Sequence, residues 1–289
     1  MKFRNILLIL VSVLFLDGCT GVESGKQFYI YDALDAYQGK PADMSADKFS
    51  RLSLLYEPWI LTDEKEPDWD KVAYRIELAK QQNIRTISTD IEHWYSMKDP
   101  QAIKDGLTEI FDKFKEEIPG CLVGNYGVPV TDLNVLRYSS TLKGKTEEEI
   151  QARWISDSRR RMPAAEACDV VFPSMYTMTD DIDQYEKDVK ITADYIRENV
   201  PGKKIIAYLW PQFYNLHSEP VDFYQRFMNG EQWSRVLEVC YDNFDGVVLW
   251  CHGRDENNIQ VSWEDPRVQE IYEATKKFMA AHKESIVVK

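Results

Sequence analysis

Two carboxylates, Asp90 and Glu92, stand two residues apart at the end of an apolar, β-rich run that begins at Ile84. In a strand, side chains two residues apart leave the same face, so both carboxyl groups can point into one cavity. Repulsion and partial burial then raise the pKa of one group while its neighbour stays ionised. Such a pair can protonate a glycosidic oxygen near neutral pH as a general acid. A solvated strand end or an ion pair with a nearby arginine is the alternative interpretation.

Aromatic and polar side chains follow most of the other β-rich runs in the same way. Pyranose rings present apolar faces that stack on aromatic rings and hydroxyls that hydrogen-bond, so this pattern predicts a sugar-binding cleft. Any single aromatic residue is better explained as a cap on the core, but the whole set favours a cleft. The candidate substrate-binding residues are Asp32, Trp94, Tyr126, Tyr208, Trp210, Trp250 and His252.

The segment from Asp90 to Trp94 resembles the D-x-E-x-W catalytic segment of the hyaluronidases, glycoside hydrolase family 56. Three further stretches are similar to motifs of that family and follow in the same order. Gly124–Pro129 is similar to its Y-G-x-P stretch, Phe172–Tyr176 to its P-S-x-Y strand end, and Asp245–Trp250 to its G-V-V-x-W strand. The four motifs span residues 90 to 250, which is most of the expected domain.

The resemblance implies a retaining mechanism in which the acetamido oxygen of an N-acetylhexosamine attacks the anomeric carbon, so that no protein nucleophile is needed. Glu92 is then the general acid and afterwards the base, and Asp90 orients and stabilises the acetamido group. Tyr176 hydrogen-bonds that group, and Tyr126 and Trp250 line the sugar subsite. The catalytic residues expected on this basis are Glu92, Asp90 and Tyr176.

Other chemistries are less well supported by the motifs. His93 and His252 both follow strand ends and could meet Asp90 or Glu92 in a metal site, but the H-x-H and H-E-x-x-H spacings are absent. A G-x-S-x-G elbow, a Walker sequence and a G-x-G-x-x-G after the first strand are absent too. We therefore expect neither a metal nor an organic cofactor.

The elements that must position these residues alternate between short β-rich runs and longer amphipathic stretches. Helical spacing is clear at Val72, Ile76 and Ala79, and again from Val189 to Val200. The runs are Phe28–Leu34, Leu52–Trp59, Ile84–Glu92, Cys121–Gly127, Val170–Tyr176, Lys204–Trp210 and Asp245–Trp250. The helix stops are Gln82-Asn83, Pro119-Gly120, Pro201-Gly202 and Asp242-Asn243.

Repeated β then α units imply parallel strands with right-handed crossovers. Seven or eight such units close most economically into a single (β/α) barrel of the TIM type, possibly distorted, with an open doubly wound sheet as the alternative. Barrel enzymes carry their chemistry at the carboxyl ends of the strands, which is where the polar and aromatic residues lie.

The amino-terminal segment has the order of a secretory signal. Positive residues precede the apolar run Ile6–Leu16, and Leu16-Asp17-Gly18-Cys19 resembles a bacterial lipobox with Cys19 as the lipidated residue. An ordinary signal peptide and an uncleaved anchor are the alternatives. The expected organisation is a signal peptide over 1–18, a linker over 19–27 and a catalytic barrel over 28–289, held by lipid in the cell envelope.

Charge and cysteine content narrow the range of partners. The 289 residues carry 35 Lys and Arg against 48 Asp and Glu, a net charge of −13, which argues against nucleic acid as a partner. A polyanionic glycan would need a local basic strip, for which Arg137, Lys143, Lys145 and Arg254 are candidates, although solvated loop charges explain each of them better. The other four cysteines have no C-x-x-C spacing and are expected to be buried free thiols.

These observations predict an exported, lipid-anchored glycoside hydrolase acting on an oligosaccharide or glycan, with Glu92 as its general acid and base. The alternative is a surface lipoprotein of barrel-hydrolase ancestry that binds glycans without cleaving them. A purely structural role is a third possibility, against which the aromatic strand ends count.

Overall fold

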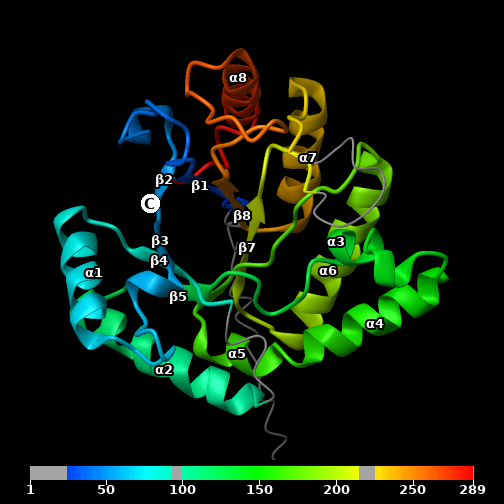
Figure 1. Ribbon diagram of the computed structural model, residues 1–289. Helices are drawn as coiled ribbons and strands as arrows, with labels where there is room; N and C mark the ends of the chain where they lie inside the picture. The colour runs from blue at the N-terminus through cyan, green and yellow to red at the C-terminus, as the bar shows by residue number, and fades with distance from the viewer. Residues whose placement is uncertain (1–24, 93–98, 215–224, 289) are drawn as a thin grey trace, which may run out of the picture.

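Figure 1 shows the computed structural model of the chain, which describes residues 25–92, 99–214 and 225–288. Strands lie at the centre and helices surround them. The bounds of the strands are β1 (Tyr29–Ala33), β2 (Ser50–Arg51), β3 (Ser53–Tyr56), β4 (Thr86–Asp90), β5 (Leu122–Asn125), β6 (Val170–Val171), β7 (Lys204–Leu209) and β8 (Gly246–Trp250). All seven predicted runs contain strand, so the predicted succession of strands is confirmed.

The strand pairings are parallel and lead around a ring. β1 pairs with β2 on one side and with β8 on the other, and β8 continues the sheet through β7 to β6. β3, β4 and β5 form the remaining arc. Only Leu52 separates β2 from β3 along the chain, and a parallel bridge between Tyr126 and Phe172 joins the ends of β5 and β6. The architecture is the parallel α/β fold of the TIM-barrel type that the sequence predicted.

The helices lie between successive strands on the outside of this ring (Figure 1). Most begin at an oxygen-bearing side chain that accepts a backbone N–H, and Thr146 and Asn229 form full capping boxes. Their bounds are α1 (Trp69–Gln81), α2 (Pro100–Glu117), α3 (Leu133–Arg137), α4 (Glu147–Arg159), α5 (Met162–Ala167), α6 (Ile182–Asn199), α7 (Gly230–Asn243) and α8 (Pro266–Ala281). The single-turn 3-10 helices are η1 (Ser45–Asp47), η2 (Glu57–Trp59) and η4 (Ser140–Leu142).

The predicted helix stops and buried helix faces are confirmed. α1, α2, α6 and α7 each end at or within two residues of the predicted stop, and Asn83, Gly120 and Gly202 adopt positive φ angles just beyond three of these ends. Val72, Ile76 and Ala79 form the buried face of α1. Val189, Ala193 and Ile196 do the same for α6.

Two hydrophobic clusters fill the molecule. The larger one lies between strands and helices and contains Phe28 and Ile30 of the first strand region, together with the helix faces. The smaller one, which we call the inner cluster, includes Tyr29, Tyr31, Leu52, Val170, Phe172, Tyr176, Ile206, Tyr208, Trp210 and Val248. Alternate residues of β1 therefore divide between the two clusters, as expected for a strand with a buried layer on each face.

The four cysteines in the described part of the chain, Cys121, Cys168, Cys240 and Cys251, are buried free thiols, as predicted. The predicted signal peptide and Cys19 lie outside the described residues. None of the helices within the described ranges is both long enough and apolar enough to cross a bilayer.

Gly124 permits the close approach of β5 to β6. A Cβ atom at this position would lie 2.2 Å from the Val170 carbonyl oxygen and 2.8 Å from Cδ2 of Phe172. Because the nearest obstacle is backbone, it cannot be relieved by rotating a side chain, and only glycine fits without moving a strand. The residues that follow, Asn125 and Tyr126, depend on this contact for their position.

We predict that Gly124→Ala lowers the free energy of unfolding by about 1–3 kcal/mol, because the added methyl group forces β5 and β6 apart. Urea denaturation measures the change. Gly25→Ala is the matched control, since a Cβ at Gly25 meets nothing within 4 Å. Equal stability of the two variants would contradict the assigned strand contact.

Candidate active site

A cleft of about 570 Å³, including its open mouth, lies at the carboxyl ends of the strands. This volume is in the usual range for a small-molecule or oligosaccharide site. The residues that line it come from β3, β4, β7 and β8 and from the segments that follow β4, β5, β6 and β7. They are Leu54, Asp90, Glu92, Tyr126, Tyr176, Tyr208, Tyr214 and Trp250. Six of these belong to the sets predicted from the sequence: Asp90, Glu92, Tyr126, Tyr176, Tyr208 and Trp250.

Asp90 and Glu92 both line the cleft, as their spacing predicted. Asp90 is the last residue of β4, and its Oδ1 atom is buried without a hydrogen-bond partner among the described residues. Burial raises the pKa of Asp90 to about 7, and the negative charges of Glu92 and Glu57 add to this effect. Glu92 is exposed at the mouth.

Small polar side chains precede Asp90 on the same face of β4. The Tyr31 hydroxyl lies 3.2 Å from Oγ1 of Thr86, and the Tyr208 hydroxyl donates to Oγ of Ser88 at 2.8 Å. These contacts satisfy the hydroxyl groups of Thr86 and Ser88 in the interior of the ring. Asp90, the next residue on that face, has no such partner for Oδ1 within the described residues, so this oxygen is available to a ligand.

Tyrosine rings form the floor beside Asp90. The ring centroids of Tyr126 and Tyr176 are 6.1 Å apart, and those of Tyr126 and Tyr208 are 5.0 Å apart. A side-chain hydrogen bond joins Tyr126 to Tyr176, and burial holds the pKa of both hydroxyls well above the usual range. The hydroxyls are therefore neutral at physiological pH and can act as hydrogen-bond donors.

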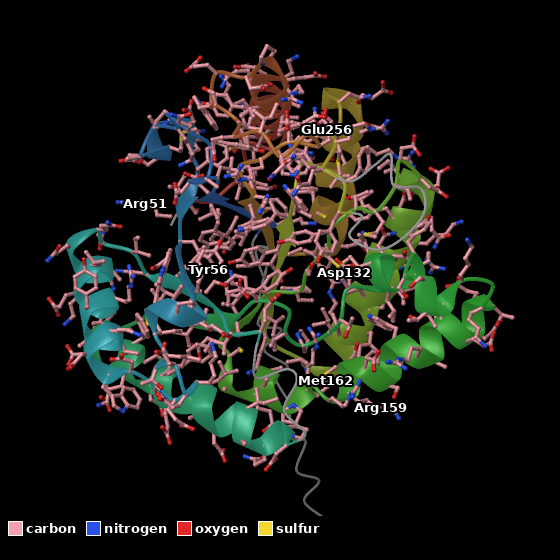
Figure 2. The ribbon with its side chains drawn as sticks, viewed as in Figure 1. Arg51, Tyr56, Asp132, Arg159, Met162 and Glu256 are labelled. Atoms are coloured by element: carbon pink, nitrogen blue, oxygen red, sulfur yellow. The ribbon has the colours of Figure 1, made fainter. Side chains whose placement is uncertain are left out.

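Trp250 forms an aromatic wall together with a residue that sequence analysis did not assign to the site. Its ring stacks on Tyr176 with centroids 5.7 Å apart and an interplanar angle of 20°. Its indole Nε1 donates to the hydroxyl of Tyr56 at 3.0 Å, which fixes the orientation of the indole. Tyr56 ends β3, so its place at a strand end was the available signal. Tyr56 and Asp132 are both labelled in Figure 2.

Asp132 is a further residue that the sequence did not reveal. It is buried, and its Oδ2 accepts hydrogen bonds from Oγ of Ser174 at 3.0 Å and from the backbone N–H of Tyr176 at 2.8 Å. Oδ1 accepts from the backbone N–H of Val135 at 3.0 Å and caps α3. Burial raises the pKa of Asp132 to about 7. This carboxyl group therefore ties the segment after β5 to the backbone that carries Tyr176.

Tyr214 also lines the cleft without having been predicted. Its backbone N–H donates to the Thr177 carbonyl at 2.8 Å, and its ring centroid lies 5.4 Å from that of Tyr176. Four residues separate it from the end of β7 at Leu209, too far for the strand-end rule to include it.

The structure corrects the prediction for Asp32. Tyr31 points into the inner cluster, so its neighbour Asp32 points to the opposite face of β1, where Lys40 Nζ lies 2.6 Å from its Oδ2. Asp32 lines a separate cavity beside Ser45 and Arg51 and does not line the cleft. Strand alternation explains the correction, because a shift of one residue reverses the face.

Two other predicted binding residues stand behind or beside the cleft. Trp210 is only 3% exposed, packs against Trp250 and Tyr176, and donates its Nε1–H to Gln212. His252 is exposed, with its Nδ1 atom 3.1 Å from Nε2 of Gln225. Neither residue is part of the cleft lining.

Some predictions concern residues outside the described ranges. Trp94 and His93 belong to this group, so the predicted stacking residue and one half of the alternative metal pair are not described. Among the described residues no group of three or more His, Cys, Asp or Glu side chains could hold a metal ion. In the candidate basic strip, Arg137 is paired with the buried Asp188 and with Glu147, so its charge is already neutralised.

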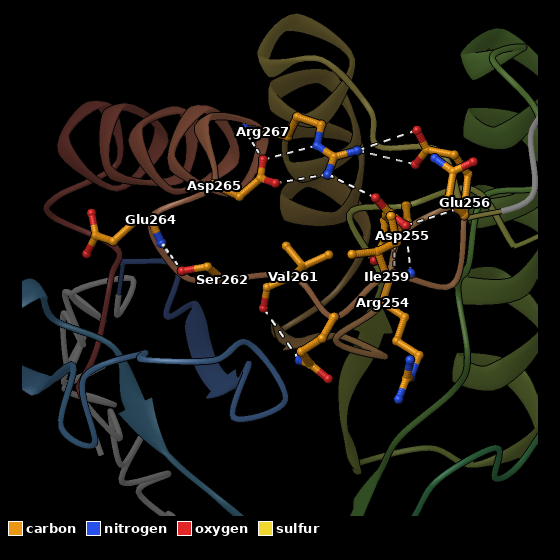
Figure 3. A network of polar contacts seen from close by, with 12 residues as sticks. Arg254, Asp255, Glu256, Ile259, Val261, Ser262, Glu264, Asp265 and Arg267 are labelled. Carbon is orange, nitrogen blue, oxygen red and sulfur yellow. Dashed lines mark hydrogen bonds and ion pairs between the residues drawn. The ribbon is translucent and has the colours of Figure 1, made fainter.

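The loop after β8 is held by a charged network that Figure 3 shows. Arg267 Nη2 lies 2.9 Å from Asp265 and 3.3 Å from Asp255, and Nη1 lies 3.3 Å from Glu256. Asp255 also accepts backbone N–H groups from Asn257 and Ile259. These bonds fasten the segment that follows Trp250 to the first turn of α8, and so steady one wall of the cleft.

Comparisons with known proteins identify the fold. No protein-family model matches the chain, and no significant match is found among curated protein sequences. Bee venom hyaluronidase is similar in structure, with a TM-score of 0.53 and 13% sequence identity over 88% of this chain and 98% of that chain. The same venom enzyme in complex with a hyaluronic acid tetramer gives a TM-score of 0.48 at 14% identity, covering 88% and 96% of the two chains.

A third structure, GH5_18 from Bifidobacterium longum, has a TM-score of 0.46 and 11% identity over 91% of this chain and 81% of that chain. At these identities the similarity to bee venom hyaluronidase shows that the chain shares its fold.

We predict that Asp90→Asn is more stable than the wild type at pH 8. The pKa of Asp90 rises from about 3.9 in the unfolded chain to about 7 in the folded protein. The folded state therefore binds the proton more tightly, and stability falls as the pH rises between these values. Asparagine removes the buried charge, so the free energy of unfolding should rise by roughly 1–4 kcal/mol at pH 8 and by almost nothing near pH 4.

Urea denaturation at the two pH values tests this expectation. Asp63→Asn removes an exposed carboxylate and serves as the control. If Asp90→Asn gains no more stability at pH 8 than the control does, burial does not raise the pKa of Asp90 in the folded protein.

Proposed function

We propose that the chain is a glycoside hydrolase that binds a glycan in the aromatic cleft and cleaves it with Glu92 as general acid and base. The observation that carries this proposal is the placement of Asp90 and Glu92 on one face at the end of β4, within a cleft walled by tyrosine and tryptophan. The barrel fold supports it, because strand ends are where barrel enzymes carry out their chemistry.

The arrangement suits substrate-assisted cleavage next to an N-acetylhexosamine, with net retention of configuration. The acetamido oxygen attacks the anomeric carbon while the glycosidic C–O bond breaks, and Glu92 transfers its proton to the leaving oxygen. Water then adds to the anomeric carbon and gives its proton to Glu92, so the acetamido group is regenerated. Exposure of Glu92 at the mouth lets it reach both the leaving group and the incoming water.

Asp90 is suited to hold the acetamido group during this reaction. Its buried Oδ1 has no hydrogen-bond partner within the described part of the chain, so it can accept the acetamido N–H. As positive charge develops on the cyclised group, a neighbouring carboxylate becomes more favourable in the low-dielectric floor. Tyr126 and Tyr176 contribute neutral hydroxyl donors, and Trp250 offers a face on which a sugar ring stacks.

The proposal includes export and membrane attachment. Cleavage before Cys19 and lipidation of its thiol would hold the barrel at the cell envelope, with residues 20–27 as a short tether. An anchored enzyme of this kind meets glycans outside the cytoplasm.

A second candidate, a glycan-binding protein without activity, is favoured by the exposure of Glu92. Burial is one of the main ways in which proteins tune a carboxylic acid for proton donation near neutral pH, and Glu92 lacks it. The same cleft would then bind the glycan through its aromatic wall alone.

We predict that Glu92→Gln lowers turnover by at least about 100-fold while glycan affinity changes little, because the amide keeps the shape but cannot transfer a proton. Release of reducing ends from chitooligosaccharides and glycosaminoglycan fragments measures turnover, and calorimetric titration measures binding. Glu109→Gln, an exposed position on α2, is the matched control.

Undiminished turnover in Glu92→Gln would remove Glu92 from the mechanism. Wild-type protein that binds these oligosaccharides but releases no reducing ends would support the binding protein instead.

A further inference from the structure

Three exposed aromatic side chains lie on η2 and α1, the two elements that follow β3. Among the described residues, the large aromatic side chains with high exposure are Trp59 at 40%, Trp69 at 44% and Tyr74 at 59%. Tyrosine and tryptophan can remain exposed singly without significance, but a cluster within sixteen positions of the chain is a feature that binding surfaces share.

Arg75 lies between two of these rings and has no polar partner among the described residues. Its guanidinium carbon is 4.6 Å from the centroid of the Trp59 ring and 5.4 Å from that of Tyr74. Its Nε atom is buried without a hydrogen bond, and within the described ranges Arg75 forms no ion pair. We call Trp59, Tyr74 and Arg75 the α1 patch.

Several described arginines lack a carboxylate partner; Arg51 and Arg85 donate to backbone carbonyl oxygens, whereas Nε of Arg75 has no hydrogen bond among the described residues. Acidic residues outnumber basic ones by 48 to 35, so carboxylates are plentiful on its surface. Other arginines of the described structure hold carboxylates, namely Arg137, Arg153, Arg160, Arg235 and Arg267. A guanidinium held by aromatic rings is suited to bind a carboxylate or sulfate.

The α1 patch is continuous with the cleft. The ring of Trp59 packs edge-on against Tyr56, with centroids 5.1 Å apart. The Tyr56 hydroxyl in turn accepts the hydrogen bond from Trp250, which lines the cleft. An unbroken row of aromatic contacts therefore leads from Trp250 through Tyr56 to Trp59 and Arg75.

We propose that the α1 patch is an accessory subsite that binds an acidic sugar residue of a glycan strand leaving the cleft over the end of β3. This inference rests on the proposed glycan function. It specifies where a further sugar residue binds and that this residue carries a negative charge. Trp59 or Tyr74 would stack on a sugar ring, and Arg75 would bind the carboxylate or sulfate attached to that strand. A glycan too short to reach past Tyr56 would not use this subsite.

Binding to hexasaccharides tests the subsite, with Glu92→Gln as the common background so that no substrate is consumed. We expect Arg75→Gln to weaken binding of hyaluronan hexasaccharide about tenfold, the loss of roughly one charge-assisted contact. Affinity for neutral chitohexaose should change little, and the affinity for hyaluronan should lose part of its salt dependence. Trp59→Ala should weaken binding of both hexasaccharides.

The matched control is Arg153→Gln, which removes an exposed arginine on α4. Keratan sulfate and chondroitin fragments separate sulfate recognition from carboxylate recognition. Thermal unfolding of each variant verifies that the fold is intact.

The inference is overturned if Arg75→Gln binds hyaluronan hexasaccharide as Arg153→Gln does, or if it loses affinity equally for chitohexaose. Polyglutamate binding as tightly as hyaluronan would also overturn it, in favour of an acidic protein partner. If Glu92→Gln binds no glycan at all, the proposed function fails together with the subsite. If it binds glycans and only the effect of Arg75 is absent, the subsite alone fails.

Discussion

The inward face of β4 is the constraint on which the candidate site depends. Because β4 is paired in parallel on both sides, Thr86, Ser88 and Asp90 must all face the interior of the ring. Tyrosine hydroxyls from β1 and β7 satisfy the first two. Asp90 follows the Tyr208–Ser88 pair on the same face of the strand, and its Oδ1 has no partner within the described structure. The inward face of β4 therefore carries two residues whose hydroxyls are paired in the interior, followed by a carboxyl group that is available to a ligand.

The packing around this strand determines the electrostatics of the cleft. Large rings exclude water from the floor, and this exclusion is the principal cause of the raised pKa of Asp90. The positions of these rings depend on residues that do not line the cleft themselves. Asp132 fixes the backbone of Tyr176, and Tyr56 fixes the indole of Trp250. The residues that touch the cleft are thus held by others that the cleft itself does not show.

Charge is distributed unevenly over the protein. Buried or half-buried carboxylates such as Asp188 and Asp255 are matched with arginine, which keeps ionised groups inside the molecule at acceptable cost. Asp90 and Arg75 differ from these pairs: among the described residues, Oδ1 of Asp90 is buried without a hydrogen-bond partner, and Arg75 has no carboxylate partner. They lie at the two ends of a continuous aromatic surface. Unpaired polar groups are where a ligand gains most from its own polar atoms.

The sequence by itself determined the elements and their order. Alternation and helical spacing depend on neighbouring residues, so the seven strand regions, the buried helix faces and the shared face of Asp90 and Glu92 could all be predicted. The tertiary structure alone decided which strand-end residues meet. Trp250 and Tyr56 are 194 positions apart, and Tyr208 and Ser88 are 120 apart. Local patterns carry no information about such pairings.

The phase of each strand relative to the ring was likewise decided only by folding, which is why Asp32 faces away from the cleft. Asp132 and Tyr214 could not be found from strand ends, because each reaches the site through a contact made by a connecting segment. The location of the raised pKa on Asp90 has the same origin. Burial is a property of the surrounding packing, and two carboxylates of similar chemistry differ only in what the folded chain places around them.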